Sequence, residues 1–208
     1  MKKVSLLFVV LNILFSLCSC KIQETTNQLA DNSLNQYITY NLPDTLINGS
    51  HNRELGYLGG NLFCLKDTGS CVTEKASTST PYGWNSYGGV EMYYKLNCKF
   101  DNGQLTDVSL PWNHSMYLSK AQPVDRCEVS AVIVQVSHDL YTASEIDAKD
   151  IGNDKLTSTM WYVFFAKENS DISYAIFLNA DYFSKEDTIS LAQSVKFKDN
   201  AFNIEIKK

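Results

Sequence analysis

Hydrophobic and polar residues alternate along several stretches of the 208-residue chain, and a period of two is typical of half-buried β-strands. Two apolar stretches on either side of the polar segment 167–171 predict a β-hairpin. An unbroken apolar run at 131–134 is typical of a buried strand. The strands predicted from these patterns cover residues 37–42, 92–100, 104–110, 127–136, 160–166, 172–179, 195–197 and 202–206.

The turn around Gly103 has two alternative registers. A two-residue Asn102-Gly103 turn would place Leu96 opposite Ser109 and would mix apolar and polar residues on each face. A three-residue loop with Gly103 in the left-handed conformation places Leu96 opposite Val108 and keeps one face apolar. We therefore predict the three-residue loop.

Helical patterns are fewer. Ser184 has the chemistry of a helix N-cap, and Glu186 and Asp187 then fall in the first turn, where the helix dipole favours negative charge. Residues 142–154 are predicted to form a short helix or a loop, and the Ser-, Thr- and Gly-rich segment 73–89 a long loop. The predicted fold class is α+β, mainly antiparallel β-sheet with one or two helices, one of them near the C-terminus.

The chain begins with a charged Met1-Lys2-Lys3 segment and an apolar run of about 14 residues, which is too short for a membrane-spanning helix of roughly 20. The run ends at Leu17-Cys18-Ser19-Cys20, which resembles the bacterial lipobox. An ordinary secretory signal peptide is the alternative. The resemblance implies that residues 1–19 are removed and that Cys20 becomes the acylated first residue of a bacterial lipoprotein.

A polar segment without periodicity follows the lipobox, so residues 20–33 are predicted to be a tether and residues 34–208 a single domain. Lys21 stands where enteric lipoproteins of the inner membrane carry Asp, which favours the outer membrane. Removal of Lys2 and Lys3 takes the formal net charge from −5 to −7. Because the chain has no long basic run, nucleic acid is not an expected partner.

Four cysteines remain besides Cys18 and the acylated Cys20, and an even number in an exported chain predicts two disulfides with three possible connectivities. Cys64 and Cys71 flank a turn-forming Asp-Thr-Gly segment and are the closest pair. That assignment leaves Cys98 to pair with Cys127. Neither spacing fits a zinc site, so no metal is predicted.

Four aromatic residues lie beside Gly and Asn in predicted loops or strand ends, and aromatics with a polar group are frequent at recognition surfaces. Their rings could also stack on sugar, and packing in the core is the alternative. The predicted binding surface consists of Tyr82, Trp84, Tyr87 and Trp112.

Two segments are similar to the PsbP-like family of exported domains: "ITYNLP" at 38–43 and "YAIFLNADYFSKEDTISLAQSVKF" at 174–197. In that family a strand leads to a capped helix, and the helix ends in a further strand. The resemblance implies a twisted sheet with a non-enzymatic binding or assembly role, and it provides no catalytic residue.

No catalytic motif is recognisable, and His51, His114 and His138 are not at ligand spacing from one another. We therefore predict a non-catalytic lipoprotein of the cell envelope, anchored to the membrane by lipid and binding a protein or a small ligand, with no cofactor. The alternative is an anchored enzyme that acts on envelope glycans through a pair of carboxylates.

Overall fold

The computed structural model describes residues 34–52, 58–73, 86–109, 116–139, 157–204 and 206. These residues form strands joined by antiparallel pairing and one α-helix near the C-terminus, so the predicted α+β class is confirmed. The elements are η1 (Leu34–Gln36), β1 (Ile38–Thr39), β2 (Leu46–Asn52), β3 (Gly59–Leu65), β4 (Gly88–Tyr94), β5 (Asn97–Asp101), β6 (Gln104–Ser109), β7 (Met116–Leu118), β8 (Gln122–Pro123), β9 (Ala131–Asp139), β10 (Thr157–Ala166), β11 (Ile172–Asn179), α2 (Lys185–Gln193) and β12 (Lys196–Phe197).

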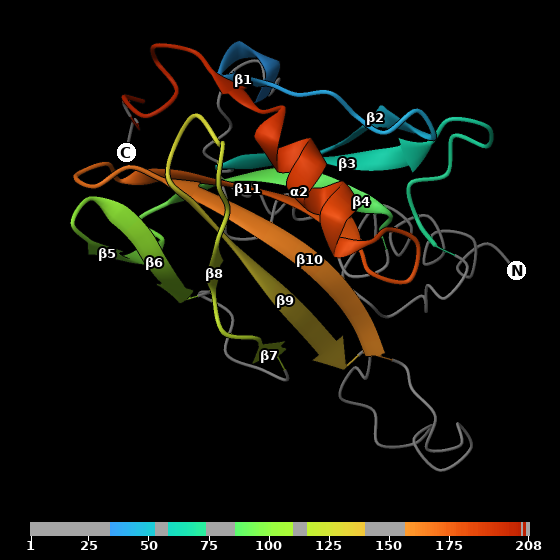
Figure 1. The fold of residues 1–208 in the computed structure, drawn as a ribbon. Helices are drawn as coiled ribbons and strands as arrows, with labels where there is room; N and C mark the ends of the chain where they lie inside the picture. Colours follow the sequence, from blue (N-terminus) through green and yellow to red (C-terminus); the bar gives the residue numbers. More distant parts are fainter. Residues whose placement is uncertain are drawn as a thin grey trace, which may run out of the picture.

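The large sheet has the strand order β2-β3-β4-β11-β10-β9-β7, and β8 pairs with the first part of β9 (Figure 1). The predicted hairpin is β10–β11. Side chains of β10 alternate between two cores: Val163 and Phe165 lie on one face, and Tyr162 and Phe164 on the other. We call the first the helix face, because α2 packs on it, and the second the hairpin face, because β5 and β6 pack on it.

Ser184 is the N-cap of helix α2, as predicted. The Ser184 hydroxyl accepts a hydrogen bond from the backbone N–H of Asp187, and the Asp187 carboxylate accepts one from the backbone N–H of Ser184 at 2.8 Å. This capping box satisfies two N–H groups that have no partner within the helix. Leu191 and Ala192 are buried against the sheet.

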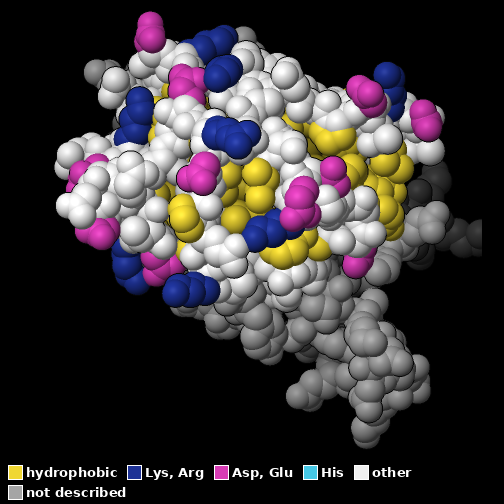
Figure 2. Space-filling view, viewed as in Figure 1, with side chains coloured by type: hydrophobic (Ala, Val, Ile, Leu, Met, Phe, Trp, Pro, Cys, Tyr) yellow, Lys and Arg dark blue, Asp and Glu magenta, His cyan; other side chains and the backbone are white. Residues whose placement is uncertain are grey.

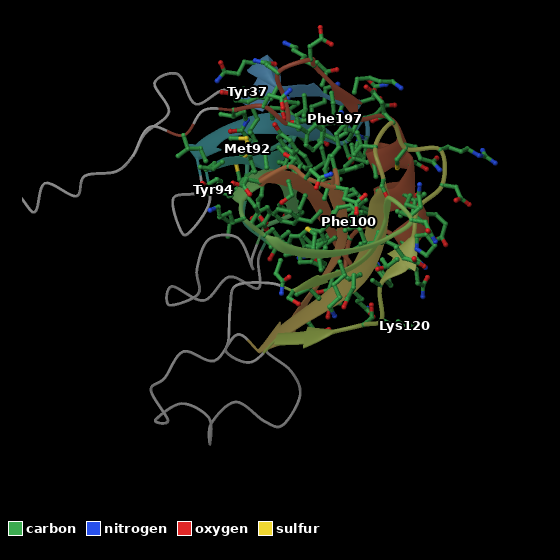
Figure 3. All side chains as sticks on the ribbon, turned by 90° about the vertical axis from the view of Figure 1, so that its left-hand side faces the viewer. Tyr37, Met92, Tyr94, Phe100, Lys120 and Phe197 are labelled. Carbon is green, nitrogen blue, oxygen red and sulfur yellow. A yellow bond between two sulfur atoms is a disulfide. The ribbon has the colours of Figure 1, made fainter. Side chains whose placement is uncertain are left out.

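The chain returns after α2 to pair with its own beginning. β12 pairs with β1, with Phe197 opposite Ile38. The predicted strand at 202–206 is wrong, because no strand is present among the described residues of this segment. The physical reason is aromatic packing: the ring of Phe197 lies 5.4 Å from that of Tyr174 and 5.0 Å from that of Phe202. Figure 3 shows Tyr37 and Phe197 in the layer beside the large sheet.

The predicted strand 92–100 is two strands. Lys95 has a φ of +56°, which ends β4 and redirects the chain into the separate β5–β6 hairpin. The predicted three-residue loop is also wrong. Asp101 pairs with Gln104 across a two-residue turn in which Asn102 and Gly103 both have positive φ.

A register shift next to this turn keeps one face of the hairpin apolar. Phe100 pairs with Leu105, whereas Cys98 pairs with Val108. The extra residue on β6 is a β-bulge, which moves the pairing by one position and restores the apolar face that a regular two-residue hairpin would lose.

The predicted loop at 73–89 ends earlier than expected, because Gly88 and Gly89 already belong to β4; residues 74–85 lie outside the description. A Cβ at Gly88 would lie 2.5 Å from the carbonyl oxygen of Phe177, and one at Gly89 would lie 2.7 Å from its ring. The glycines are therefore strand residues that leave room for Phe177. The segment 142–154 also falls outside the described residues.

Candidate functional site

A groove of about 580 Å³ lies between β6 and the segment that connects β8 to β9. Its walls are residues 104–106 and 123–131. Leu105, Val124 and Val129 are buried and supply apolar surface, whereas the exposed residues around them, apart from Pro123, are polar or charged. This size and mixture are typical of ligand sites in proteins.

Three different elements hold the wall at 123–131 in place. The backbone N–H of Val124 donates to the carbonyl of Ala131 at 2.9 Å, and the hydroxyl of Ser130 accepts from the backbone N–H of Leu105 at 2.7 Å. Gln193 of α2 donates from Nε2 to the carbonyl of Asp125 at 2.9 Å. Because the sheet, the hairpin and the helix all contribute, the groove is built into the fold.

Arg126 is the free cation of the groove within the described part of the chain. It is exposed, and it makes no hydrogen bond or ion pair. Its backbone has a φ of +63°, a conformation that costs a non-glycine residue free energy. The neighbouring Glu128 carboxylate lies 3.8 Å from the ammonium of Lys196. The guanidinium of Arg126 is therefore available to a ligand in the groove, and the nearby carboxylate of Glu128 is already paired with Lys196.

Cys127 also lines the groove, as a half-buried thiol. Burial raises its pKa to about 11, and the negative charge of Asp125 acts in the same direction. Since the thiolate is the nucleophilic form of cysteine, this thiol is poorly reactive at neutral pH.

The predicted Cys98–Cys127 disulfide is wrong, because both residues are free thiols in the structure. Cys98 packs with the core of the hairpin face, whereas Cys127 packs with the core of the helix face. The spacing along the chain gave no indication that the two side chains belong to opposite faces.

The predicted Cys64–Cys71 disulfide is present. The chain turns between the two cysteines through Gly69, whose φ is +69°, and Leu65 donates from its backbone N–H to the carbonyl of Ser70 at 2.8 Å. The disulfide joins Cys64 of β3 to the segment after the turn and lies against Gly49 of β2, where a Cβ would lie 2.9 Å from the sulfur of Cys71.

The predicted aromatic binding surface is wrong in the part that the structure describes. Tyr87 is 5% exposed, and its ring packs edge-on against Tyr182 at 4.9 Å. Its carbonyl accepts from the backbone N–H of Asn179, so Tyr87 is core next to the start of β4. The other three residues, Tyr82, Trp84 and Trp112, lie outside the described residues, as does Cys20.

A buried carboxylate on the hairpin face was not predicted. Glu91 of β4 is 1% exposed and accepts a hydrogen bond from the hydroxyl of Tyr93. The same face carries a row of rings, in which Tyr162 stacks on Phe177 at 4.5 Å and on Phe164 at 5.6 Å. The available signal was a single Glu inside the apolar stretch 88–94, since carboxylates are seldom fully buried unless paired.

Comparison with family models, curated proteins and solved structures finds no match to this chain. The described ranges contain no cluster of three His, Cys, Asp or Glu side chains that could bind a metal ion. They also contain no helix with the length and apolar character needed to span a membrane. The side chains of His51, His114 and His138 are not described.

Proposed function

We propose that this protein is an exported, lipid-anchored domain of the bacterial cell envelope that binds a protein or a small ligand in the groove at 104–106 and 123–131 without converting it chemically. The observation that carries the proposal is the free guanidinium of Arg126, held in strained backbone beside the apolar surface of the groove. Backbone strain at such a position is characteristic of functional sites.

The cysteines support export. The Cys64–Cys71 disulfide suits an oxidising compartment. Cys98 and Cys127 suit the same compartment, because burial raises the pKa of each thiol to about 11 and slows oxidation. Together with Leu17-Cys18-Ser19-Cys20, this supports an acylated Cys20, and Lys21 after it favours an anchor in the outer membrane.

The thiol of Cys127 also favours binding over catalysis in the groove. A catalytic cysteine has a lowered pKa, and the pKa of Cys127 is raised. Arg126 is suited to orient a bound group, since guanidinium donates several hydrogen bonds and keeps its charge.

The anchor is tested by fractionation of cells that express the full chain. Cys20→Ser is expected to move the protein from the membrane fraction to the soluble fraction, because it removes the residue that carries the acyl chains. Cys18→Ser is the matched control and should stay in the membrane fraction. Membrane retention of the Cys20→Ser protein would contradict a lipid anchor at this position.

Binding in the groove is tested with a photo-crosslinking amino acid placed at Arg126 in living cells. A covalent adduct, detected by mass spectrometry, is expected at this position. The same amino acid at Glu168, which lies exposed in the β10–β11 turn, is the control. Absence of an adduct at 126, or the same adduct at both positions, would contradict the proposed site.

A further inference from the structure

The rim of the groove carries a negative and a positive side chain on consecutive residues. Asp125 and Arg126 are both exposed, and both line the groove. Within the described part of the chain, neither side chain makes a hydrogen bond or an ion pair, with the other or with a third group. The carboxylate of Glu128, by contrast, lies 3.8 Å from the ammonium of Lys196. The rim therefore offers a ligand one carboxylate and one guanidinium that are not yet paired.

The backbone fixes the place of these two charges. The carbonyl of Asp125 accepts a hydrogen bond from Nε2 of Gln193 on α2 at 2.9 Å, and Arg126 follows with a φ of +63°. Just before them, the backbone N–H of Val124 donates to the carbonyl of Ala131 on β9 at 2.9 Å. Because helix and sheet both hold this turn, little main-chain ordering is needed when a ligand binds.

The floor of the groove is apolar. Leu105, Val124 and Val129 line it and are buried. On the opposite wall the hydroxyl of Ser130 donates to the side-chain oxygen of Gln104 at 3.4 Å, so the two walls are joined. A volume of about 580 Å³ lies within the range of sites that bind ligands larger than a single amino acid.

We propose that the groove binds a short peptide that has free termini and an apolar side chain. The terminal carboxylate accepts two parallel hydrogen bonds from the guanidinium of Arg126, and the terminal ammonium pairs with Asp125. The apolar side chain lies on the floor formed by Leu105, Val124 and Val129. This inference rests on the proposed function and deepens it, because it names the ligand class of the same groove.

The charges around the groove disfavour strongly anionic ligands. A phosphate group with two negative charges would lie beside the carboxylates of Asp125 and Glu128, with Arg126 as its cation within the described lining. In Figure 2, acidic and basic side chains are interspersed around α2 and β8, and neither sign predominates. A ligand with one charge of each sign matches this rim.

The test is calorimetric titration of the detergent-solubilised full chain with the tripeptide Ala-Leu-Ala. We expect binding, and we expect the C-terminal amide and the N-acetyl form of the peptide each to bind at least about tenfold more weakly, since each loses a charge-assisted contact. Ala-Ser-Ala should also bind more weakly, because it lacks the apolar side chain. Free leucine, which is too small to fill the groove, should bind more weakly than Ala-Leu-Ala.

Two substitutions assign each terminus to its partner. Arg126→Gln should bind Ala-Leu-Ala at least about tenfold more weakly and should no longer distinguish it from the amide, whereas Asp125→Asn should no longer distinguish it from the N-acetyl form. Lys66→Gln and Asp67→Asn are the matched controls. These residues are also consecutive, exposed and of opposite charge, but they lie in the turn after β3 and not in the groove. Both controls should bind as the wild type does.

Melting temperatures identify a folding defect. If one of the two substitutions prevents folding, the other and the modified peptides on the wild type decide the question. Failure of the wild type to bind Ala-Leu-Ala overturns the proposal, and so does equal binding of the peptide, its amide and its N-acetyl form. A folded Arg126→Gln protein that still distinguishes the amide also overturns it. A crosslinked adduct at position 126 without peptide binding would overturn the peptide alone and leave the proposed function intact.

Discussion

The hydroxyl of Tyr93 donates a hydrogen bond to the carboxylate of Glu91, two residues earlier on β4, inside the core of the hairpin face. Both side chains are almost fully buried, at 2% and 1% exposure. Buried polar groups are costly without partners, so this hydrogen bond is one of the interactions that make a carboxylate tolerable among aromatic rings. The contribution of this hydrogen bond to the free energy of unfolding can be measured.

Tyr93→Phe removes the hydroxyl and leaves the ring. Because Glu91 then loses a donor in a buried position, we expect the free energy of unfolding to fall by about 1–3 kcal/mol. Chemical denaturation measures the change. The adjacent Tyr94 is 42% exposed, and Tyr94→Phe should change stability by no more than about 0.5 kcal/mol. Equal effects of the two substitutions would mean that the hydroxyl of Tyr93 has no special role.

Gly49→Ala is expected to destabilise the protein by about 1–3 kcal/mol, as overpacking does. The added methyl group would meet both sulfurs of the Cys64–Cys71 disulfide and would lie 2.9 Å from the carbonyl oxygen of Leu62. Gly59→Ala on the neighbouring strand is the control, since its Cβ would meet nothing within 4 Å. Denaturation curves of the two variants should differ clearly, and identical curves would contradict the close contact at Gly49.

Ser184→Ala removes the N-cap of α2 and should lower the free energy of unfolding by about 0.5–2 kcal/mol. Ser190→Ala, at an exposed position of the same helix, should be neutral or slightly stabilising.

The hydrogen bonds from Ser184 lower the pKa of Asp187. The cap therefore stabilises the fold when Asp187 is ionised, and this contribution is lost as the pH falls below about 4, where carboxyl groups take up protons. Loss of ellipticity on acidification should be steeper in the wild type than in Ser184→Ala.

A thiol assay distinguishes one disulfide from two. A chain that lacks residues 1–20 should show two reactive thiols when it is denatured without reductant, from Cys98 and Cys127. In the native protein both should react slowly near neutral pH. The rate should rise about tenfold for each pH unit until the pH approaches 11, since the thiolate is the reactive form. Absence of free thiols would mean that Cys98 and Cys127 form a second disulfide, in contradiction to the structure.

Local chemistry was a good guide where neighbouring residues decide the structure. The β10–β11 hairpin, the cap at Ser184 and the Cys64–Cys71 pair each depend on residues close together in the chain, and all three were predicted. Periodicity also identified the apolar face of β5 and β6. It could not indicate that a bulge, and not a longer loop, produces this face, because both solutions place Val108 inward.

Relationships between distant segments were not predictable in the same way. The pairing of β12 with β1 depends on rings of Tyr174 and Phe202 that meet only in the folded state. The groove depends on the hydrogen bond that the backbone N–H of Leu105 donates to the hydroxyl of Ser130, 25 residues further along the chain. Local patterns did suggest an exposed Tyr87, since it lies in a Gly- and Ser-rich stretch, but the β4 pairing that follows it places its ring in the core.

The pairing of Ile38 with Phe197 has a consequence for how the chain acquires its structure. A polypeptide is synthesised from its N-terminus, so β1 is made early, but the partner of that strand follows only after all strands of the large sheet. Contacts between such distant residues form slowly, because a long loop must close first. The chain can therefore complete this layer only after β12 has been synthesised, so the nascent domain stays open until all strands of the large sheet have been made.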